Sequence, residues 1–211
     1  MKHGIALLLD QKGVDDLYNC QKFLEKFLPN IMPKLGHNIN LPHITLIQGQ
    51  ILNIDHVTVL QNLAKYISKH KSELEISSCK IYEDGWIFLL IKPDQLLKNA
   101  HLMSFDLVSN KMVSVSDISS DEVKKKLSYY KKKEKEYFLQ YGHRYIKETY
   151  IPHITLGKVE DVASININQI EVEINKYLAN IELTKIHLSK ISYHELGDLG
   201  SYSKEVLSIE L

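Results

Sequence analysis

Two histidine–threonine pairs stand in the same five-residue frame of this sequence. The frame Pro-His-Ile-Thr-Leu occurs at residues 42–46 and again at residues 152–156. Side chains alternate between the two faces of a β-strand, so a histidine and the threonine two positions later point the same way. Two such strands side by side would bring two imidazoles and two hydroxyls to one small anion. The four side chains are those of His43, Thr45, His153 and Thr155.

These four groups suit phosphodiester chemistry at neutral pH. Because free imidazole has a pKa of about 6.5, one ring can act as base while the other, protonated, acts as acid. Threonine hydroxyls can donate hydrogen bonds to non-bridging phosphate oxygens, and an imidazolium adds positive charge where negative charge develops. The pattern therefore predicts acid–base catalysis at a phosphate, and it leaves open which histidine takes which part.

Other histidines offer rivals and a control. His56 and Thr58 have the same spacing, but they lie in a segment of helical periodicity, where positions two apart diverge by about 200°. His187 and Ser189 fall in a predicted strand without the five-residue frame. Ten histidines also raise the alternative of a metal site. No H-E-x-x-H and no closely spaced Cys/His set occurs, so we expect no metal.

Composition limits the other classes of function. The 26 basic residues balance 26 acidic ones, which gives no reason to expect tight non-specific binding to nucleic acid. No P-loop, G-x-G-x-x-G or G-x-S-x-G motif is present, so we expect no cofactor. Cys20 and Cys79 are expected to be reduced thiols. The apolar run at residues 5–9 is too short to span a membrane. We expect a cytoplasmic monomer with no membrane and no obligatory protein partner.

The remaining periodicity places the two frames in an α+β fold. Strands are predicted where apolar residues alternate or cluster, and helices where they recur every three or four residues. Asp15 and Asp16 are predicted in a helical first turn. The predicted strands are 3–9, 42–48, 74–82, 86–91, 152–159, 181–193 and 202–211, and the predicted helices are 14–27, 55–70 and 168–177. Because hairpins join several strands, we expect largely antiparallel sheets in a single domain, 1–211.

Residues 94–141 form a region of helical pattern that is rich in lysine. Its lysines and tyrosines could form an RNA-facing patch, but interspersed glutamates favour a solvated helical face. Trp86 beside the predicted turn at residues 83–85 favours a hairpin anchor over a platform for base stacking. Tyr202 is expected to pack in the interior.

The sequence resembles the 2H phosphoesterases, and within them the group of 2'-5' RNA ligase-like proteins and RNA 2',3'-cyclic phosphodiesterases. The resemblance covers nearly the whole chain and rests on the opening strand 4–9, the hairpin around Trp86, residues 152–157 and the closing hairpin at 200–202. It implies a bilobal, pseudo-two-fold α+β fold with a central groove. It also implies that His43 and His153 are general acid and base, and that Thr45 and Thr155 hold the phosphate.

Departures from this family pattern concern the substrate contacts. The family often has an aromatic residue where Gln48 stands and an arginine where Lys158 stands. Lysine keeps the charge without the planar fork of arginine. Lys158 and Tyr145 are predicted to contact substrate, whereas Arg144, the sole arginine, is as well explained by packing on a tyrosine.

The expected substrate is an RNA end, a 2',3'-cyclic phosphate, or a 2'-5' linked or cyclic oligonucleotide. A non-catalytic module that binds nucleotides or RNA ends on the same fold is the alternative. The interval of 110 positions from His43 to His153 exceeds the interval expected of compact members. The region 94–141 is expected to hold the extra length and to cover the groove.

Overall fold

Seven antiparallel strands form the framework of the part of the chain that the structure, a computed structural model, describes: residues 1–36, 39–70 and 73–211. The strand order is β1-β2-β5-β4-β3-β6-β7, and β1 also pairs with β6. The strands are β1 (His3–Leu9), β2 (His43–Gly49), β3 (Glu73–Ile81), β4 (Trp86–Ile91), β5 (His153–Lys158), β6 (Lys185–Leu196) and β7 (Tyr202–Glu210). The α+β class with antiparallel sheets is therefore confirmed.

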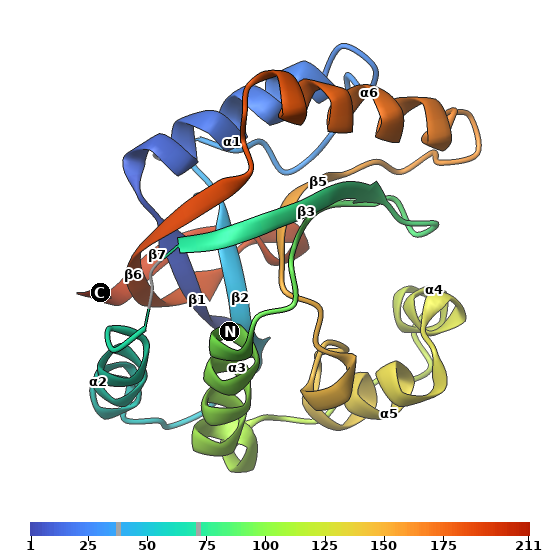
Figure 1. Ribbon diagram of the computed structural model, residues 1–211. Coiled ribbons are helices and arrows are strands. Elements are labelled where there is room, and N and C mark those ends of the chain that lie inside the picture. The colour runs from blue at the N-terminus through green and yellow to red at the C-terminus, as the bar shows by residue number, and fades with distance from the viewer. Residues whose placement is uncertain (37–38, 71–72) are drawn as a thin grey trace.

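Two groups of strands make the two halves of the fold. The first contains β1, β2, β6 and β7, and the second contains β3, β4 and β5. They meet where β2 touches β5 through one residue pair and where β3 joins β6. Helices α2 (His56–Ile67) and α3 (Gln95–Val108) pack on the first half, whereas α1 (Gln11–Leu24) and α6 (Ile167–Asn180) pack together beside the second (Figure 1).

Side-chain caps set the start of most helices. Asp10 accepts a hydrogen bond from the backbone N–H of Gly13 at 2.8 Å, so α1 begins three residues before the predicted start. The prediction that Asp15 and Asp16 occupy its first turn was therefore wrong. The same helix ends at Leu24 rather than at residue 27. Further side-chain caps are Asp55 for α2, Asp94 for α3 and Asn166 for α6.

The lysine-rich region is less continuous than its pattern predicts. It contains α3, α4 (Asp121–Tyr129) and α5 (Lys132–Tyr141), but residues 112–120 are not helical. Serine and β-branched residues dominate this stretch, and both favour other conformations over a helix. Its backbone pairs with neighbouring segments instead, because the N–H of Val113 donates to the carbonyl of Gln50 at 2.9 Å.

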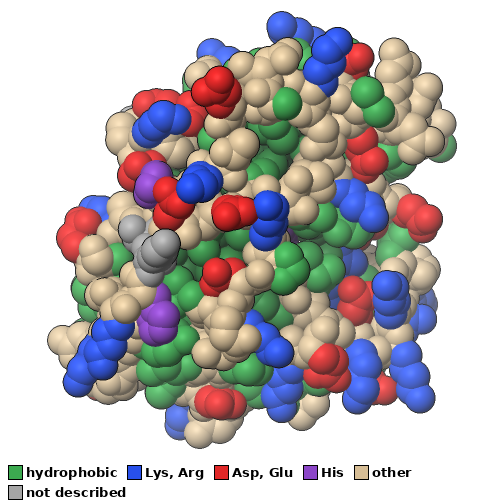
Figure 2. All heavy atoms as spheres, in the orientation of Figure 1, with side chains coloured by type: hydrophobic (Ala, Val, Ile, Leu, Met, Phe, Trp, Pro, Cys, Tyr) green, Lys and Arg blue, Asp and Glu red, His purple; other side chains and the backbone are tan. Residues whose placement is uncertain are grey.

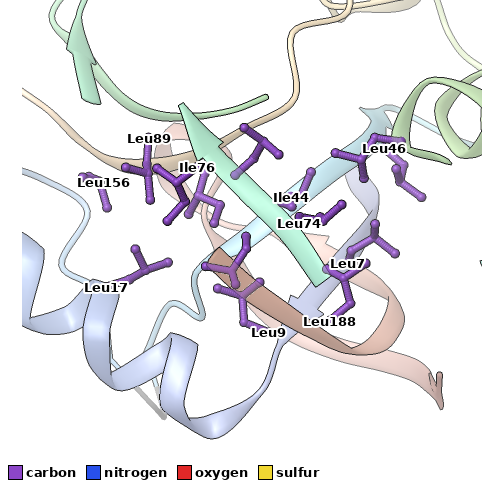
Figure 3. Packing of buried hydrophobic residues seen from close by; sticks show 14 of the residues in the cluster. Leu7, Leu9, Leu17, Ile44, Leu46, Leu74, Ile76, Leu89, Leu156 and Leu188 are labelled. Atoms are coloured by element: carbon purple, nitrogen blue, oxygen red, sulfur yellow. The ribbon is translucent and has the colours of Figure 1, made fainter. Parts of the chain in front are cut away.

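A continuous apolar core fills the space between strands and helices. Leu7, Ile44 and Leu89 come from three different strands, and Leu17 of α1 reaches the same cluster (Figure 3). Cys20 and Cys79 are buried free thiols, as expected. Among the described residues, no helix is both long and apolar enough to cross a membrane.

Candidate active site

The two predicted motifs lie on neighbouring strands at the junction of the halves. Ile44 of β2 pairs with Ile154 of β5 in antiparallel register, so the two His-x-Thr segments are centred on one another. Both isoleucines are fully buried. The histidines and threonines alternate with them and are part-exposed. Because the pairing is antiparallel, His43 lies across from Thr155, and His153 across from Thr45.

A β-bulge follows each motif at the same position. In the β1–β2 pairing, Thr45 and Ile47 have partners on β1 whereas Leu46 has none. In the β4–β5 pairing, Thr155 and Gly157 have partners on β4 whereas Leu156 has none. The extra residue redirects the chain, so the residue three positions after each threonine returns to the motif face. The bulges therefore make the two halves of the site locally equivalent.

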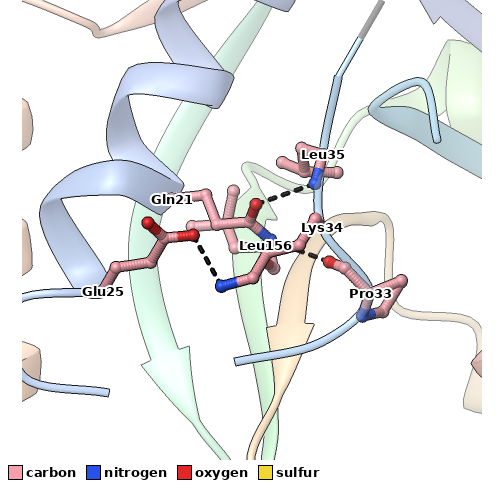
Figure 4. A network of polar contacts seen from close by, with 6 residues as sticks. All are labelled: Gln21, Glu25, Pro33, Lys34, Leu35 and Leu156. Atoms are coloured by element: carbon pink, nitrogen blue, oxygen red, sulfur yellow. Dashed lines mark hydrogen bonds and ion pairs between the residues drawn. The ribbon is translucent and has the colours of Figure 1, made fainter. Parts of the chain in front are cut away.

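Each bulge is held by a buried polar side chain from a helix. Gln21 of α1 donates to the carbonyl of Leu156 at 2.6 Å and also binds the loop at Pro33 and Leu35 (Figure 4). His101 of α3 donates from Nδ1 to the carbonyl of Leu46 at 2.6 Å. Its Nε2 accepts the N–H of Lys147 at 2.8 Å. Hydrogen bonds thereby satisfy both bulge carbonyls and fix the strands that carry the motifs.

The two motif histidines share one hydrogen-bonding arrangement. Nδ1 of His43 lies 2.7 Å from the carbonyl oxygen of Leu41, and Nδ1 of His153 lies 2.6 Å from that of Ile151. Since a carbonyl oxygen only accepts hydrogen bonds, Nδ1 carries the hydrogen in each ring. In the neutral state, Nε2 is therefore the basic nitrogen of both rings.

Aromatic residues surround His153. Its ring stacks on Phe88 at a centroid distance of 3.8 Å and meets the edge of Tyr145 at 5.4 Å. Burial lowers the pKa of His153 to about 4, despite the opposing hydrogen bond to Ile151. The positive charges of Arg144 and of His43 contribute to this lowering of the His153 pKa. The neutral ring is thus strongly favoured before a phosphate binds.

The surroundings of His43 are more polar. Its ring meets the edge of His194 at 5.5 Å, and His194 in turn stacks on Tyr202 at 4.3 Å. Tyr202 is buried, as expected, and its hydroxyl is 2.8 Å from that of Ser192. Burial also lowers the pKa of His43. The two halves are therefore equivalent in backbone but not in the side chains that support each histidine.

A small pocket opens between the halves. His43 and Thr155, the pair across the strands, line it together with the loop residues Asn40, Gly200 and Ser201. His153 and Thr45 are not among its lining residues. An anion in this pocket would contact one imidazole and one hydroxyl that belong to different motifs.

Lys158 and Gln48 occupy the matching positions after the two bulges. The ammonium of Lys158 lies 5.3 Å from the centre of the Trp86 ring. Gln48 donates from Nε2 to Nδ1 of His143 at 3.2 Å. Both side chains are part-exposed and lie on the motif face. The contact of Lys158 with substrate stays a prediction.

The other predicted contact, Tyr145, is only 6% exposed and packs beside His153. Its neighbour Arg144 lies between the rings of Tyr130 and Tyr145, with each centre 4.5 Å from its guanidinium carbon. Arg144 also pairs with Asp84 at 3.1 Å. Arg144 therefore joins the region before α5 to the β3–β4 turn, which agrees with packing rather than with phosphate binding.

The rival histidines lie elsewhere. His56 is the first residue of α2. The hydroxyl of Thr58 donates a hydrogen bond to the carboxylate of Asp55 at 2.7 Å. His187 is exposed on β6 and lies 3.7 Å from Glu73. Within the described ranges, no three His, Cys, Asp or Glu side chains form a group that could hold a metal ion.

Sequence reasoning did not find the residues that support the motifs. Gln21, His101 and Phe88 come from elements distant in sequence, and no local pattern links them to the frames. The equivalence of Gln48 with Lys158 had a visible signal. When the two frames are aligned, Gln48 and Lys158 each stand three residues after the motif threonine.

Several solved structures are similar to this chain, and one of them, with a TM-score above 0.5, supports the fold. TT0787 of Thermus thermophilus matches with a TM-score of 0.54 and 10% identity, over 100% of this chain and 98% of that one. A protein described as a phosphoesterase matches at 0.44 and 8%, over 100% and 98%. Kluyveromyces marxianus Usb1 with uridine monophosphate matches at 0.43 and 12%, over 100% and 97%. No protein-family model matches the sequence, and no curated protein is significantly similar to it.

Proposed function

We propose that the chain is a metal-independent phosphodiesterase that acts on an RNA end, a 2',3'-cyclic phosphate, or a 2'-5' linked or cyclic oligonucleotide. The observation that carries the proposal is the antiparallel pairing of Ile44 with Ile154, which centres two His-x-Thr segments on one another. With Nδ1 of both histidines bound to backbone carbonyls, each ring has one nitrogen left for a proton transfer.

The proposed reaction needs one neutral and one protonated histidine. The neutral Nε2 removes a proton from water or from a ribose hydroxyl, whose oxygen then attacks phosphorus. The protonated Nε2 of the other ring delivers its proton to the departing oxygen, so the two rings exchange their protonation states in one turnover. Hydrogen bonds from Thr45 and Thr155 stabilise the non-bridging oxygens as charge builds on them. Lys158 and Tyr145 are the proposed substrate contacts.

Histidine substitution tests the proposal. Replacing His43 or His153 with alanine should lower kcat on a 2',3'-cyclic-phosphate-ended RNA on the order of a hundredfold or more, because general acid or base catalysis is lost. His56→Ala, which removes the histidine of the helical H-x-T, is the matched control and should stay near the wild-type rate. A wild-type rate in His43→Ala or His153→Ala would refute acid–base catalysis by this pair.

Two further outcomes separate the alternatives. Activity should survive incubation with EDTA, and its loss would remove the metal-independent mechanism. A screen of cyclic nucleotides, 2',3'-cyclic-phosphate ends and 2'-5' linked oligonucleotides should record products as well as binding. Tight binding without product from any of them would favour the non-catalytic module, because binding alone has no need of a paired acid and base.

A further inference from the structure

The local pseudo-two-fold of the site is broken by the residues beside each motif. On the β4–β5 half, Trp86 pairs with Lys158 and Phe88 with Thr155. On the β1–β2 half, the corresponding partners are Gly4 with Gln48 and Ala6 with Thr45. Trp86 thus corresponds to Gly4, and Phe88 to Ala6. One half presents large aromatic rings and a cation where the other has the two smallest residues and a neutral amide.

The small residues of the first half do not leave a free space. A Cβ at Gly4 would lie 2.8 Å from Cε1 and Nε2 of His194, so the ring of His194 already fills that position. Gln48 is engaged with His143. The position that corresponds to Trp86 is therefore filled by the ring of His194, and Gln48 is held by a contact within the protein.

The Trp86 side has the opposite character. Trp86 is part-exposed, and the ammonium of Lys158 lies over its ring. Lys158 forms no ion pair with the described residues, although it is half-buried. Burial lowers its pKa, the carboxylates of Asp84 and Glu160 oppose this effect, and Lys125 and Lys126 of α4 add positive charge nearby. Neither carboxylate forms an ion pair with the half-buried ammonium, so a bound phosphate would offset part of the cost of its burial.

The lysines of α4 belong to the mixed charged surface on that side of the molecule (Figure 2). Lys126 pairs with Glu122 at 2.6 Å and Lys124 with Asp121 at 3.7 Å. These pairs agree with a solvated helical face, so the outer surface of α4 carries little net charge. The positive charge relevant to a ligand is therefore that of Lys158 at the inner edge.

We propose that Trp86 and Lys158 form a subsite for a second nucleotide of single-stranded RNA, next to the reacting phosphate and on the β4–β5 half alone. Lys158 is two register steps from Thr155, about 7 Å along the strand, which suits the next phosphate of a polynucleotide. The Trp86 ring would stack on the attached base, a contact that tolerates any base. This inference rests on the proposed function, and it makes the substrate an oligonucleotide that crosses the site in one direction.

Two substrates with the same reacting group test the subsite kinetically. We expect kcat/KM for a tetraribonucleotide ending in a 2',3'-cyclic phosphate to exceed that for the mononucleoside 2',3'-cyclic phosphate at least tenfold. Trp86→Leu and Lys158→Gln should each bring this ratio close to one. Lys185→Gln is the matched control and should keep the wild-type ratio, because Lys185 lies on β6 and pairs with Glu73 of β3. An unchanged ratio in Trp86→Leu would overturn the proposal.

Fluorescence gives a readout that does not depend on turnover. Trp86 is the sole tryptophan, so stacking of a base should quench the intrinsic emission of the protein. A tetraribonucleotide with a 3'-phosphate should quench it in the wild type and in His153→Ala, whereas inorganic phosphate should not. Quenching without hydrolysis of any substrate would support the subsite and reject the proposed enzyme. Hydrolysis without quenching at a saturating tetranucleotide concentration would reject the subsite alone.

Discussion

The two motif histidines are identical in sequence frame and in backbone hydrogen bond, yet their side-chain surroundings differ. His153 lies between phenyl and phenol rings, whereas His43 lies beside another imidazole. Since burial is the main cause of the lowered pKa at both rings, both favour the neutral form in the free protein. The proposed mechanism requires one protonated ring, so only a small fraction of the free enzyme is in the active protonation state at neutral pH.

The small population of the singly protonated enzyme at neutral pH predicts an acidic pH optimum. The pH profile of kcat/KM should be bell-shaped, and its two limbs report the pKa values of the two histidines in the free enzyme. Both limbs should therefore lie below pH 6.5, and the limb of His153 should lie near 4. Activity should fall about tenfold per pH unit above the alkaline limb. The kcat profile should lie at higher pH, because a bound phosphate favours the imidazolium. A kcat/KM that stays level from pH 6.5 to 8 would contradict the lowered pKa values.

The strands position the site through their bulges, and glycine makes one bulge possible. Gly157 has a φ of +148°, and a Cβ there would collide with Cγ1 of buried Ile31. We expect Gly157→Ala to destabilise the fold by roughly 1–3 kcal/mol, because the strained backbone and the overlap act together. Gly36→Ala, where the nearest atom would be 3.9 Å away, is the control. Urea unfolding of both variants checks this, and equal stabilities would contradict the strain.

Sequence periodicity predicted the strands of this site and the shared face of each histidine and threonine. It did not predict the bulges, because the pairing of Thr45 with Ala6 and of Ile47 with Ile5 depends on a partner strand far away in sequence. For the same reason, Gln21 and His101 could not be recognised as the donors to the bulge carbonyls. The helix pattern of 94–141 failed at residues 112–120, where backbone pairing to Gln50 and Leu139 replaces helical hydrogen bonds.

At the scale of the whole molecule, histidines with strongly lowered pKa values are found in both halves. His153 lies on β5, His194 lies on β6, and His143 contacts both Tyr145 and Gln48 of β2. Burial lowers the pKa of His143 to about 3, of His153 to about 4 and of His194 to about 2. All three remain neutral in the folded protein at pH values where an unfolded histidine, with a pKa of about 6.5, is protonated.

The folded state should therefore lose stability as the pH falls below 6.5. Between that value and the folded pKa, the unfolded chain binds more protons, so each such histidine lowers the free energy of unfolding by ~1.4 kcal/mol per pH unit. Urea unfolding at pH 7, 6 and 5 measures this slope. His194→Phe keeps a ring against Tyr202 but cannot be protonated there. The slope of its unfolding free energy against pH should therefore be smaller by ~1.4 kcal/mol per pH unit, which corresponds to one proton. A wild-type unfolding free energy that is constant from pH 7 to 5 would mean that these rings are not held neutral, and the buried surroundings described for His153 would then be wrong as well.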